Sequence, residues 1–136
     1  MTRKQAQIIG RLQSFGFSWE EANAIRRIEM TLHSWAEQEC GDGNDYCSWS
    51  IERDEATGLP YRCVYPHSGS MRRTRIPDRE KGALKRLEAI LANHPEWIYY
   101  HQGDPRGCSL YLIRKSDIQP GTSLDSCYTR GIAVAA

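Results

Sequence analysis

The sequence predicts an α+β fold in a single domain, with a mainly antiparallel sheet that about three helices cover. Three observations lead to this prediction. Residues 96–114 hold two strand-like runs around a polar turn, which is the pattern of a β-hairpin. Residues 47–52 alternate apolar and polar types, the period of a half-buried strand. Ser18 and Glu21 form a capping box ahead of an apolar stripe with helical spacing.

Residues 1–40 are expected to form a pair of helices. Residues 3–13 place apolar side chains at helical spacing, and the pattern breaks at 14–16. The second helix follows the capping box, and the run Gly-Asp-Gly-Asn at 41–44 ends it. Its apolar stripe consists of Ile25, Ile28, Leu32 and Trp35. Two helices joined by so short a break also have the length of a helix-turn-helix.

Residues 45–76 are expected to be strands. Cys47, Trp49 and Ile51 alternate with polar residues, so they share one buried face. A turn at Ala-Thr-Gly leads to a return strand over 61–65. The arginine-rich residues 71–76 are either an edge strand or an extended arm.

A third helix is expected over 77–93. Pro77 suits its first turn, because the N–H that proline lacks is not needed there. Asp78 and Glu80 complement the positive end of the helix dipole. Asn-His-Pro at 93–95 ends the helix. Its buried stripe is expected to be Leu84, Leu87, Ile90 and Leu91.

Residues 96–136 are expected to form the hairpin and a terminal strand. The connector, residues 103–107, consists almost wholly of turn-forming types. Pro105 suits the second position of a turn, and either glycine of the connector can take a positive φ. The last apolar run, at 132–134, predicts the terminal strand.

Length and composition limit the classes of function. A chain of 136 residues makes one domain, over 1–136, that can bury a core without metal or disulfide staples. Its 40% apolar and 26% charged residues are a globular balance that argues against wholesale disorder. The net charge of +1 excludes a binder driven by bulk positive charge and an acidic mimic of DNA. An electrostatic partner must therefore meet a local patch.

The cysteines and the N-terminal residues indicate in which cellular compartment we expect the protein. The five cysteines are an odd number, widely spaced and without a C-x-x-C pair. The first residues lack the apolar core of a signal peptide. No apolar run approaches the ~18 residues needed to span a bilayer. We therefore expect free thiols in a reducing cytoplasm and no membrane partner.

Protein binding fits the composition best. Four tryptophans and seven tyrosines exceed what so small a core needs, and these residue types carry much of the energy of protein contacts. The expected contact residues are the hairpin corner and its neighbours: Tyr99, His101, Asp104, Arg106 and Tyr111. The opposing interpretation is that aromatic residues simply favour strands.

Nucleic-acid binding is the first alternative, through the run Arg72-Arg73-Thr74-Arg75. Arginine beside aromatic residues can hold phosphates and stack on bases. Against this, the second helix begins with two glutamates, which repel phosphate, and arginines on a strand often only protect a sheet edge. For a protein partner, Arg72, Arg73 and Arg75 are the expected second contact patch.

A small enzyme centred on His101 and Cys108 is the second alternative. The two residues flank the same turn, so a cysteine–histidine nucleophile pair is geometrically possible. Neither lies in a hydrolase signature, and the chain has no phosphate-binding glycine motif. No metal or cofactor is expected, because the four histidines and five cysteines lack the short spacing that pairs zinc ligands. His33 and Cys40 lie seven apart, which would place them on one face if the second helix continues.

Several segments of the chain carry a common pattern. The C-terminal part reads Tyr-Tyr-His-Gln-Gly-Asp-Pro-Arg-Gly-Cys-Ser-Leu-Tyr-Leu at 99–112 and Tyr-Thr-Arg-Gly-Ile-Ala-Val at 128–134. The helix at 25–35 and the helix entry at 76–80 belong to the same pattern. Together these segments resemble a family of small proteins from bacteriophages, prophages and plasmids. The family is largely without assigned chemistry, so no catalytic residue carries over.

The resemblance implies a mobile-element protein that acts in a bacterial cytoplasm. Single-domain proteins of that kind often block host defence complexes, including CRISPR–Cas effectors, by occupying a protein surface. We therefore expect a non-enzymatic binding protein of the anti-CRISPR type, whose partner is a bacterial protein complex. The near-neutral charge departs from the acidic DNA-mimic type, so shape and aromatic contacts would have to provide the binding.

Overall fold

The computed structural model of the chain describes residues 1–32, 47–67, 69–104 and 106–134. Its helices are α1 (Arg3–Ser14), α2 (Trp19–Thr31), α4 (Asp78–Leu91) and α5 (Leu124–Cys127), with 3-10 turns η1 (Lys115–Asp117) and η2 (Tyr128–Arg130). Its strands are β1 (Cys47–Arg53), β2 (Pro60–Pro66), β3 (Arg72–Thr74), β4 (Trp97–Asp104), β5 (Gly107–Arg114) and β6 (Ile132–Ala133).

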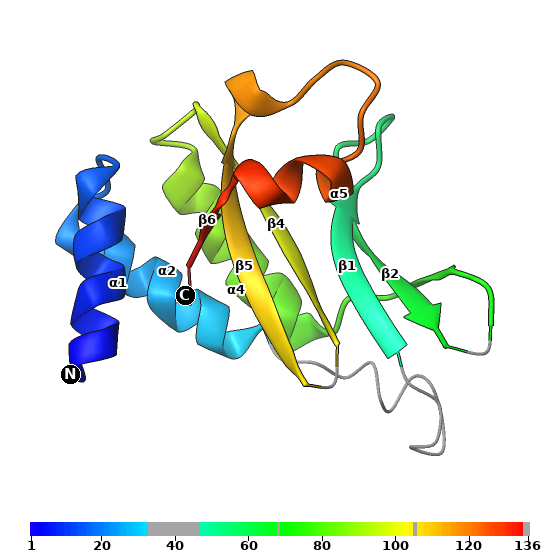
Figure 1. Cartoon of the computed structure of the whole chain (residues 1–136), viewed down its shortest axis with the longest axis horizontal. Coiled ribbons are helices and arrows are strands. Elements are labelled where there is room, and N and C mark those ends of the chain that lie inside the picture. The colour runs from blue at the N-terminus through cyan, green and yellow to red at the C-terminus, as the bar shows by residue number, and fades with distance from the viewer. Residues whose placement is uncertain (33–46, 68, 105, 135–136) are drawn as a thin grey trace.

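The six strands form one antiparallel sheet in the order β3-β2-β1-β4-β5-β6. Helices α1, α2 and α4 lie on one face of this sheet, and α5 lies over the other (Figure 1). The main core fills the space between the three long helices and the sheet. The predicted α+β class is confirmed. In the described residues, no helix is both long and apolar enough to span a membrane.

The first two helices begin where their caps predict. The Ser18 hydroxyl accepts the Glu21 N–H at 3.0 Å, and the Glu21 carboxylate accepts the Ser18 N–H at 2.9 Å. The predicted capping box is therefore confirmed. Ile25, Ile28 and Leu32 of the predicted stripe are buried. Trp35 lies outside the described residues, so the predicted extension to residue 40 stays a prediction.

Strands β1 and β2 form the predicted hairpin, with a turn in which Gly58 has a φ of +70°. Cys47, Trp49 and Ile51 are all buried, as their alternation predicts. The arginine-rich segment pairs with β2 through Arg72–Thr74, so it is an edge strand rather than a free arm.

Helix α4 follows Pro77, and its buried stripe contains Leu84, Leu87 and Leu91, while Ile90 is only partly buried. At the other end of the sheet, β6 pairs with β5, which confirms the predicted terminal strand. Between β5 and β6 the chain also forms the short helix α5, which the sequence did not predict.

The predicted β4–β5 hairpin is confirmed, with a shorter connector than expected. The strands stay paired up to Asp104 and Gly107, and neither Gly103 nor Gly107 has a positive φ. Gly103 is required for a different reason: a Cβ there would lie 2.5 Å from Cζ2 of Trp49. The glycine thus makes room for a buried indole on the paired strand.

Candidate functional site

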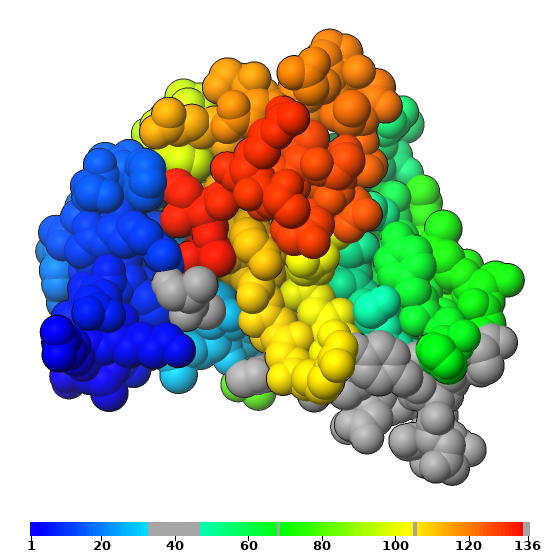
Figure 2. Space-filling model, in the orientation of Figure 1, coloured from blue at the N-terminus to red at the C-terminus, as the bar shows by residue number. Residues whose placement is uncertain are grey.

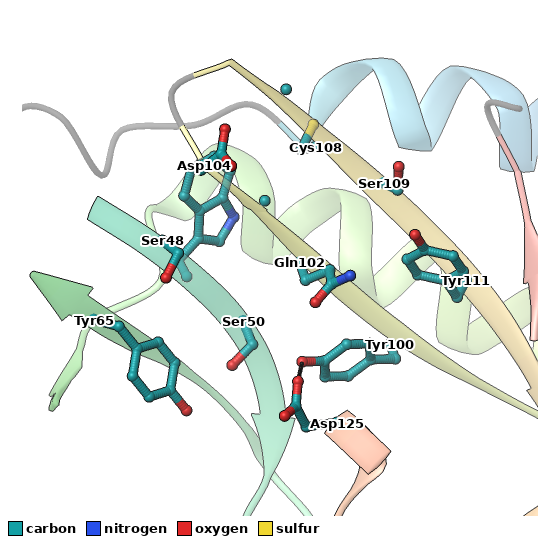
Figure 3. A pocket seen from close by; sticks show the side chains of 13 residues that line it. Ser48, Ser50, Tyr65, Tyr100, Gln102, Asp104, Cys108, Ser109, Tyr111 and Asp125 are labelled. Atoms are coloured by element: carbon teal, nitrogen blue, oxygen red, sulfur yellow. Dashed lines mark hydrogen bonds between the residues drawn. The ribbon is translucent and has the colours of Figure 1, made fainter. Parts of the chain in front are cut away.

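The outer face of the sheet, opposite the long helices, is only partly covered. Helix α5 and η2 pack on it through an apolar cluster that includes Tyr100, Ile113 and Cys127. Figure 2 shows the C-terminal segment, in orange and red, lying over the upper part of the sheet, while the lower part of the hairpin stays uncovered. Beside α5 the same face is hollowed over about 590 Å³. We call this region the sheet hollow (Figure 3).

The sheet hollow is lined by side chains from five elements, β1, β2, β4, β5 and α5. They are Ser48, Ser50, Tyr65, Tyr100, Gln102, Asp104, Ser109, Tyr111 and Asp125, together with the edges of Trp49, Gly103, Gly107 and Cys108. Strand register brings them together, since Ser50 pairs with Gln102 and Gln102 pairs with Ser109. Residues directly opposite each other in a ladder project from the same face. Most of the lining is therefore set by the period-two alternation of β1, β4 and β5.

One wall of the hollow is a tyrosine bonded to a carboxylate. The Tyr100 hydroxyl donates to Oδ1 of Asp125 at 2.8 Å, and the Tyr100 ring stacks on Tyr128 with centroids 5.6 Å apart. Burial, followed by the hydrogen bond to Asp125, raises the pKa of Tyr100 well above its usual range. The phenol therefore remains a neutral donor, held in place by α5.

Ser50 provides a buried polar group that faces this wall. Its residue is only 4% exposed, and its hydroxyl lies between Tyr65 and the Tyr100–Asp125 pair (Figure 3). Within the described residues, the Ser50 Oγ has no partner in hydrogen-bonding geometry, although the Tyr65 and Tyr100 hydroxyls lie nearby. Leaving a buried hydroxyl unsatisfied costs about 1–3 kcal/mol. A ligand group that reaches Ser50 would remove this penalty.

The hairpin corner forms the rim of the hollow, where Arg106 is exposed and Asp104 is partly buried. Oδ1 of Asp104 accepts the Arg106 backbone N–H at 2.8 Å, which holds the turn. The Arg106 guanidinium lies 3.1 Å from Oδ2 of Asp104 and keeps 79% of its side chain exposed. With carboxylates at Asp104 and Asp125 and no lysine or arginine in the described lining, the hollow favours partners that donate hydrogen bonds.

The structure corrects two of the predicted contact residues. Tyr99 is 1% exposed and donates to Glu88 at 3.1 Å, while His101 is fully buried. Both project from β4 toward the helices, because their parity is opposite to that of Tyr100 and Gln102. Neither side chain can contact a partner on the surface. Tyr111 does line the hollow, as does Asp104.

The predicted arginine patch lies on the far edge strand and is largely paired. Arg73 lies 3.4 Å from Asp54 and 3.9 Å from the centre of the Tyr61 ring. Arg75 lies 3.2 Å from Asp78. These contacts agree with the interpretation in which the arginines protect a sheet edge.

The His101–Cys108 pair does not have the properties of an activated nucleophile. Burial, with the nearby Arg62 charge, lowers the pKa of His101 to about 3, and burial raises the pKa of Cys108 to about 11. The Cys108 thiol donates to the Leu32 carbonyl at 3.2 Å. A nucleophilic cysteine needs the opposite shift, toward the thiolate. These two pKa shifts and the Cys108 hydrogen bond therefore do not favour the enzyme alternative.

The oxidation state of the cysteines differs in part from the expectation that all of them are free thiols. Cys63, Cys108 and Cys127 are free thiols, whereas Cys47 is disulfide-bonded. The expectation of free thiols throughout is therefore wrong at Cys47. Within the part of the chain that the structure describes, no three histidine, cysteine or acidic side chains gather as a metal site. His33 and Cys40 lie outside it.

Comparison with protein-family models, with curated proteins and with solved structures gave no match to this chain. The function must therefore be argued from the site.

Proposed function

We propose that the protein is a non-enzymatic binding protein that contacts a protein partner through the sheet hollow and the hairpin corner. The observation that carries this proposal is the buried Ser50 hydroxyl, which faces an open polar hollow beside the Tyr65 and Tyr100 hydroxyls and makes no well-aligned hydrogen bond to a described residue. Buried polar groups in native proteins are nearly always satisfied. A partner that inserts a donor or acceptor here completes the site.

The chemistry of the rim favours a protein over a nucleic acid at this face. The Asp125 carboxylate disfavours phosphates, and the Asp104 carboxylate is already paired with Arg106, whereas the hydroxyl groups and the Gln102 amide suit backbone and side-chain groups of a polypeptide. Tyr65, which is 40% exposed, and Tyr111 add aromatic surface of the kind that anchors protein contacts.

The partner that we propose is a bacterial protein complex, in particular a defence complex such as a CRISPR–Cas effector. The likeness of 99–112 and 128–134 to proteins of mobile elements supports this choice. The near-neutral charge fits a protein that blocks its target by shape rather than by mimicking DNA. The site of action would then be the bacterial cytoplasm.

The test is a variant that fills the hollow, compared with one that changes the surface elsewhere. Gln102→Lys places a long charged side chain in the hollow, and Gln119→Lys makes the same change at an exposed position away from it. We expect the tagged protein to co-purify with a defence complex and to reduce plasmid interference in a host with an active CRISPR–Cas system.

Gln102→Lys should lose at least about tenfold of both the capture and the inhibition, because it fills the space and adds a charge that opposes the desolvation of the interface. Gln119→Lys should keep both. Equal capture by the two variants would contradict the proposed surface. A protein that neither enriches a defence complex nor changes interference in any such host would contradict the proposed partner.

A further inference from the structure

Helix α4 separates its charges between two sides. Each of its three carboxylates pairs with an arginine from another part of the chain: Asp78 with Arg75, Glu80 with Arg62, and Glu88 with Arg53. None of its four basic residues is in an ion pair with a described residue. These bases are Arg79, Lys81, Lys85 and Arg86, and all are exposed. These four bases therefore carry positive charge that no ion pair with a described residue neutralises.

Two of these bases line a groove with a third from the neighbouring helix. Arg79 and Arg86 of α4 face Arg27 of α2 across a hollow of about 590 Å³. The remaining lining residues are Ala24, Ile28, Met30 and Thr31, so no carboxylate belongs to the described lining. We call this site the α2–α4 groove.

Helix geometry sets the spacing of the charges. Arg79 and Arg86 are seven residues apart, which places them on one side of α4 about 10 Å apart. Gly82 lies between them and carries no side chain, and Nη1 of Arg86 would be 3.6 Å from a Cβ there. The Arg86 guanidinium therefore lies over Gly82, where a larger residue would contact it.

We infer that the α2–α4 groove binds the phosphate backbone of a nucleic acid. Guanidinium forks match phosphate oxygens, and arginine is the residue type that proteins use most for this recognition. Regular spacing along a rigid helix suits a polyanion with regularly spaced charges better than an acidic peptide whose carboxylates sit on flexible side chains. The lining offers no base-reading pattern, so binding is independent of sequence.

This site is separate from the one proposed above. The groove is lined by residues of α2 and α4, which lie on one face of the sheet (Figure 1), whereas the sheet hollow is lined by strand residues and by Asp125 of α5, which lies over the other face. It also differs from the arginine run at 72–75, whose Arg73 and Arg75 are paired with Asp54 and Asp78. The binding of a nucleic acid and the binding of a protein partner can therefore be tested separately.

The experiment measures the binding of a fluorescent 20-nucleotide single strand and the matching duplex to the whole protein, over a range of salt concentrations. The test variant is Arg79→Gln/Arg86→Gln, and the matched control is Arg3→Gln/Lys115→Gln. The control removes two exposed bases outside the groove, so both variants have the same net charge. Gln102→Lys is included because it alters only the sheet hollow.

We expect the test variant to bind at least about tenfold more weakly, and its salt slope on the single strand to be smaller by about 1.4, since two phosphate contacts are lost. The control and Gln102→Lys should bind as the unaltered protein does. Arg27→Gln, on the other wall, should reduce the slope by about 0.7 and gives an independent reading if the double variant does not fold.

Three results would overturn the inference. The first is no binding of either nucleic acid at low salt. The second is an equal loss in the control variant, which would make the effect one of bulk charge. The third is tighter binding of a 20-residue poly-glutamate than of the nucleic acids, with the same dependence on Arg79 and Arg86, which would make the groove a site for acidic proteins.

Discussion

The two faces of strand β4 place the same kinds of residue in opposite environments. Tyr99 and His101 point into the helix-covered core, where both are buried. Tyr100 and Gln102, their immediate neighbours, line the sheet hollow on the other face. This difference shows that a tyrosine or a histidine near the hairpin turn does not by itself indicate a binding site. Whether helices cover the face decides which of them meets a partner.

The covered face holds charge as well as apolar groups. Arg62 of β2 and Glu80 of α4 form an ion pair in which the side chains are 0% and 4% exposed. The open face has no such buried pair among its described residues, and its polar groups turn toward the hollow instead. We therefore expect changes on the covered face to act on stability, and changes on the open face to act on binding.

The largest effect is expected from Arg62→Met, which leaves Glu80 buried without its cation. Breaking a buried ion pair from one side costs about 3–5 kcal/mol of unfolding free energy. Urea denaturation measures the loss. The double variant Arg62→Met/Glu80→Met should recover most of it, because apolar residues of similar volume replace buried pairs well. If Arg62→Met loses less than about 1 kcal/mol of unfolding free energy, the proposed difference between the covered and the open face is wrong.

His101 should make the covered face sensitive to acid. Burial and the Arg62 charge lower its pKa in the folded protein to about 3, below the ordinary value of about 6.5 that it regains on unfolding. Between these values only the unfolded chain binds the proton, so stability falls as the pH drops below about 6.5. At pH 4.5 the loss is on the order of 2–3 kcal/mol.

The measurement is urea denaturation from pH 7 to pH 4.5 for the unaltered protein and for His101→Phe. Carboxylates titrate in both proteins, so the difference between the two curves isolates the histidine. We expect the variant to lose less stability over this range. Parallel curves would show that His101 is not held neutral by burial.

Gly103→Ala probes the packing of Trp49 against strands β4 and β5. A Cβ at this position would lie 2.5 Å from the Trp49 ring and 2.7 Å from the Cβ of Cys108, so overpacking should cost about 1–3 kcal/mol. Gly107→Ala is the matched control, because no atom lies within 4 Å of a Cβ there. Thermal unfolding of both variants tests this, and equal midpoints would refute the steric role of Gly103.

The smallest effects are expected when each of the adjacent residues Tyr99 and Tyr100 is replaced by phenylalanine. These two variants compare the covered face of β4 with its open face. Tyr100→Phe removes the bond to Asp125, and Tyr99→Phe removes the bond to Glu88, so each should lose about 1 kcal/mol of stability. Only Tyr100→Phe should also weaken capture of the partner in the co-purification assay. If Tyr99→Phe weakens it as much, the loss comes from stability and not from the open face.

The sequence was a good guide to elements and a weaker one to the site. Caps and periodicity predicted α1, α2, α4, the hairpin and the terminal strand. Nearness to the hairpin turn predicts Tyr99 and His101 as contact residues. It omits Tyr100 and Gln102, which line the sheet hollow. The alternation of β4 was the signal that separates these pairs. Asp125 gave no such signal, because its place beside Tyr100 depends on a helix that begins 20 residues after the hairpin strand Trp97–Asp104 ends.

By itself, the sequence determined where the long helices and the main strands lie and which residues share a face, because caps, turns and side-chain periodicity act over a few residues. The tertiary structure alone decided which face of the sheet is covered and which charges remain on the surface. Glu80 and Glu88 turn inward to arginines 18 and 35 residues earlier, and this leaves the outer side of α4 positive on a chain whose net charge is only +1. Ion pairing depends on distance in space, and only the folded chain sets that distance.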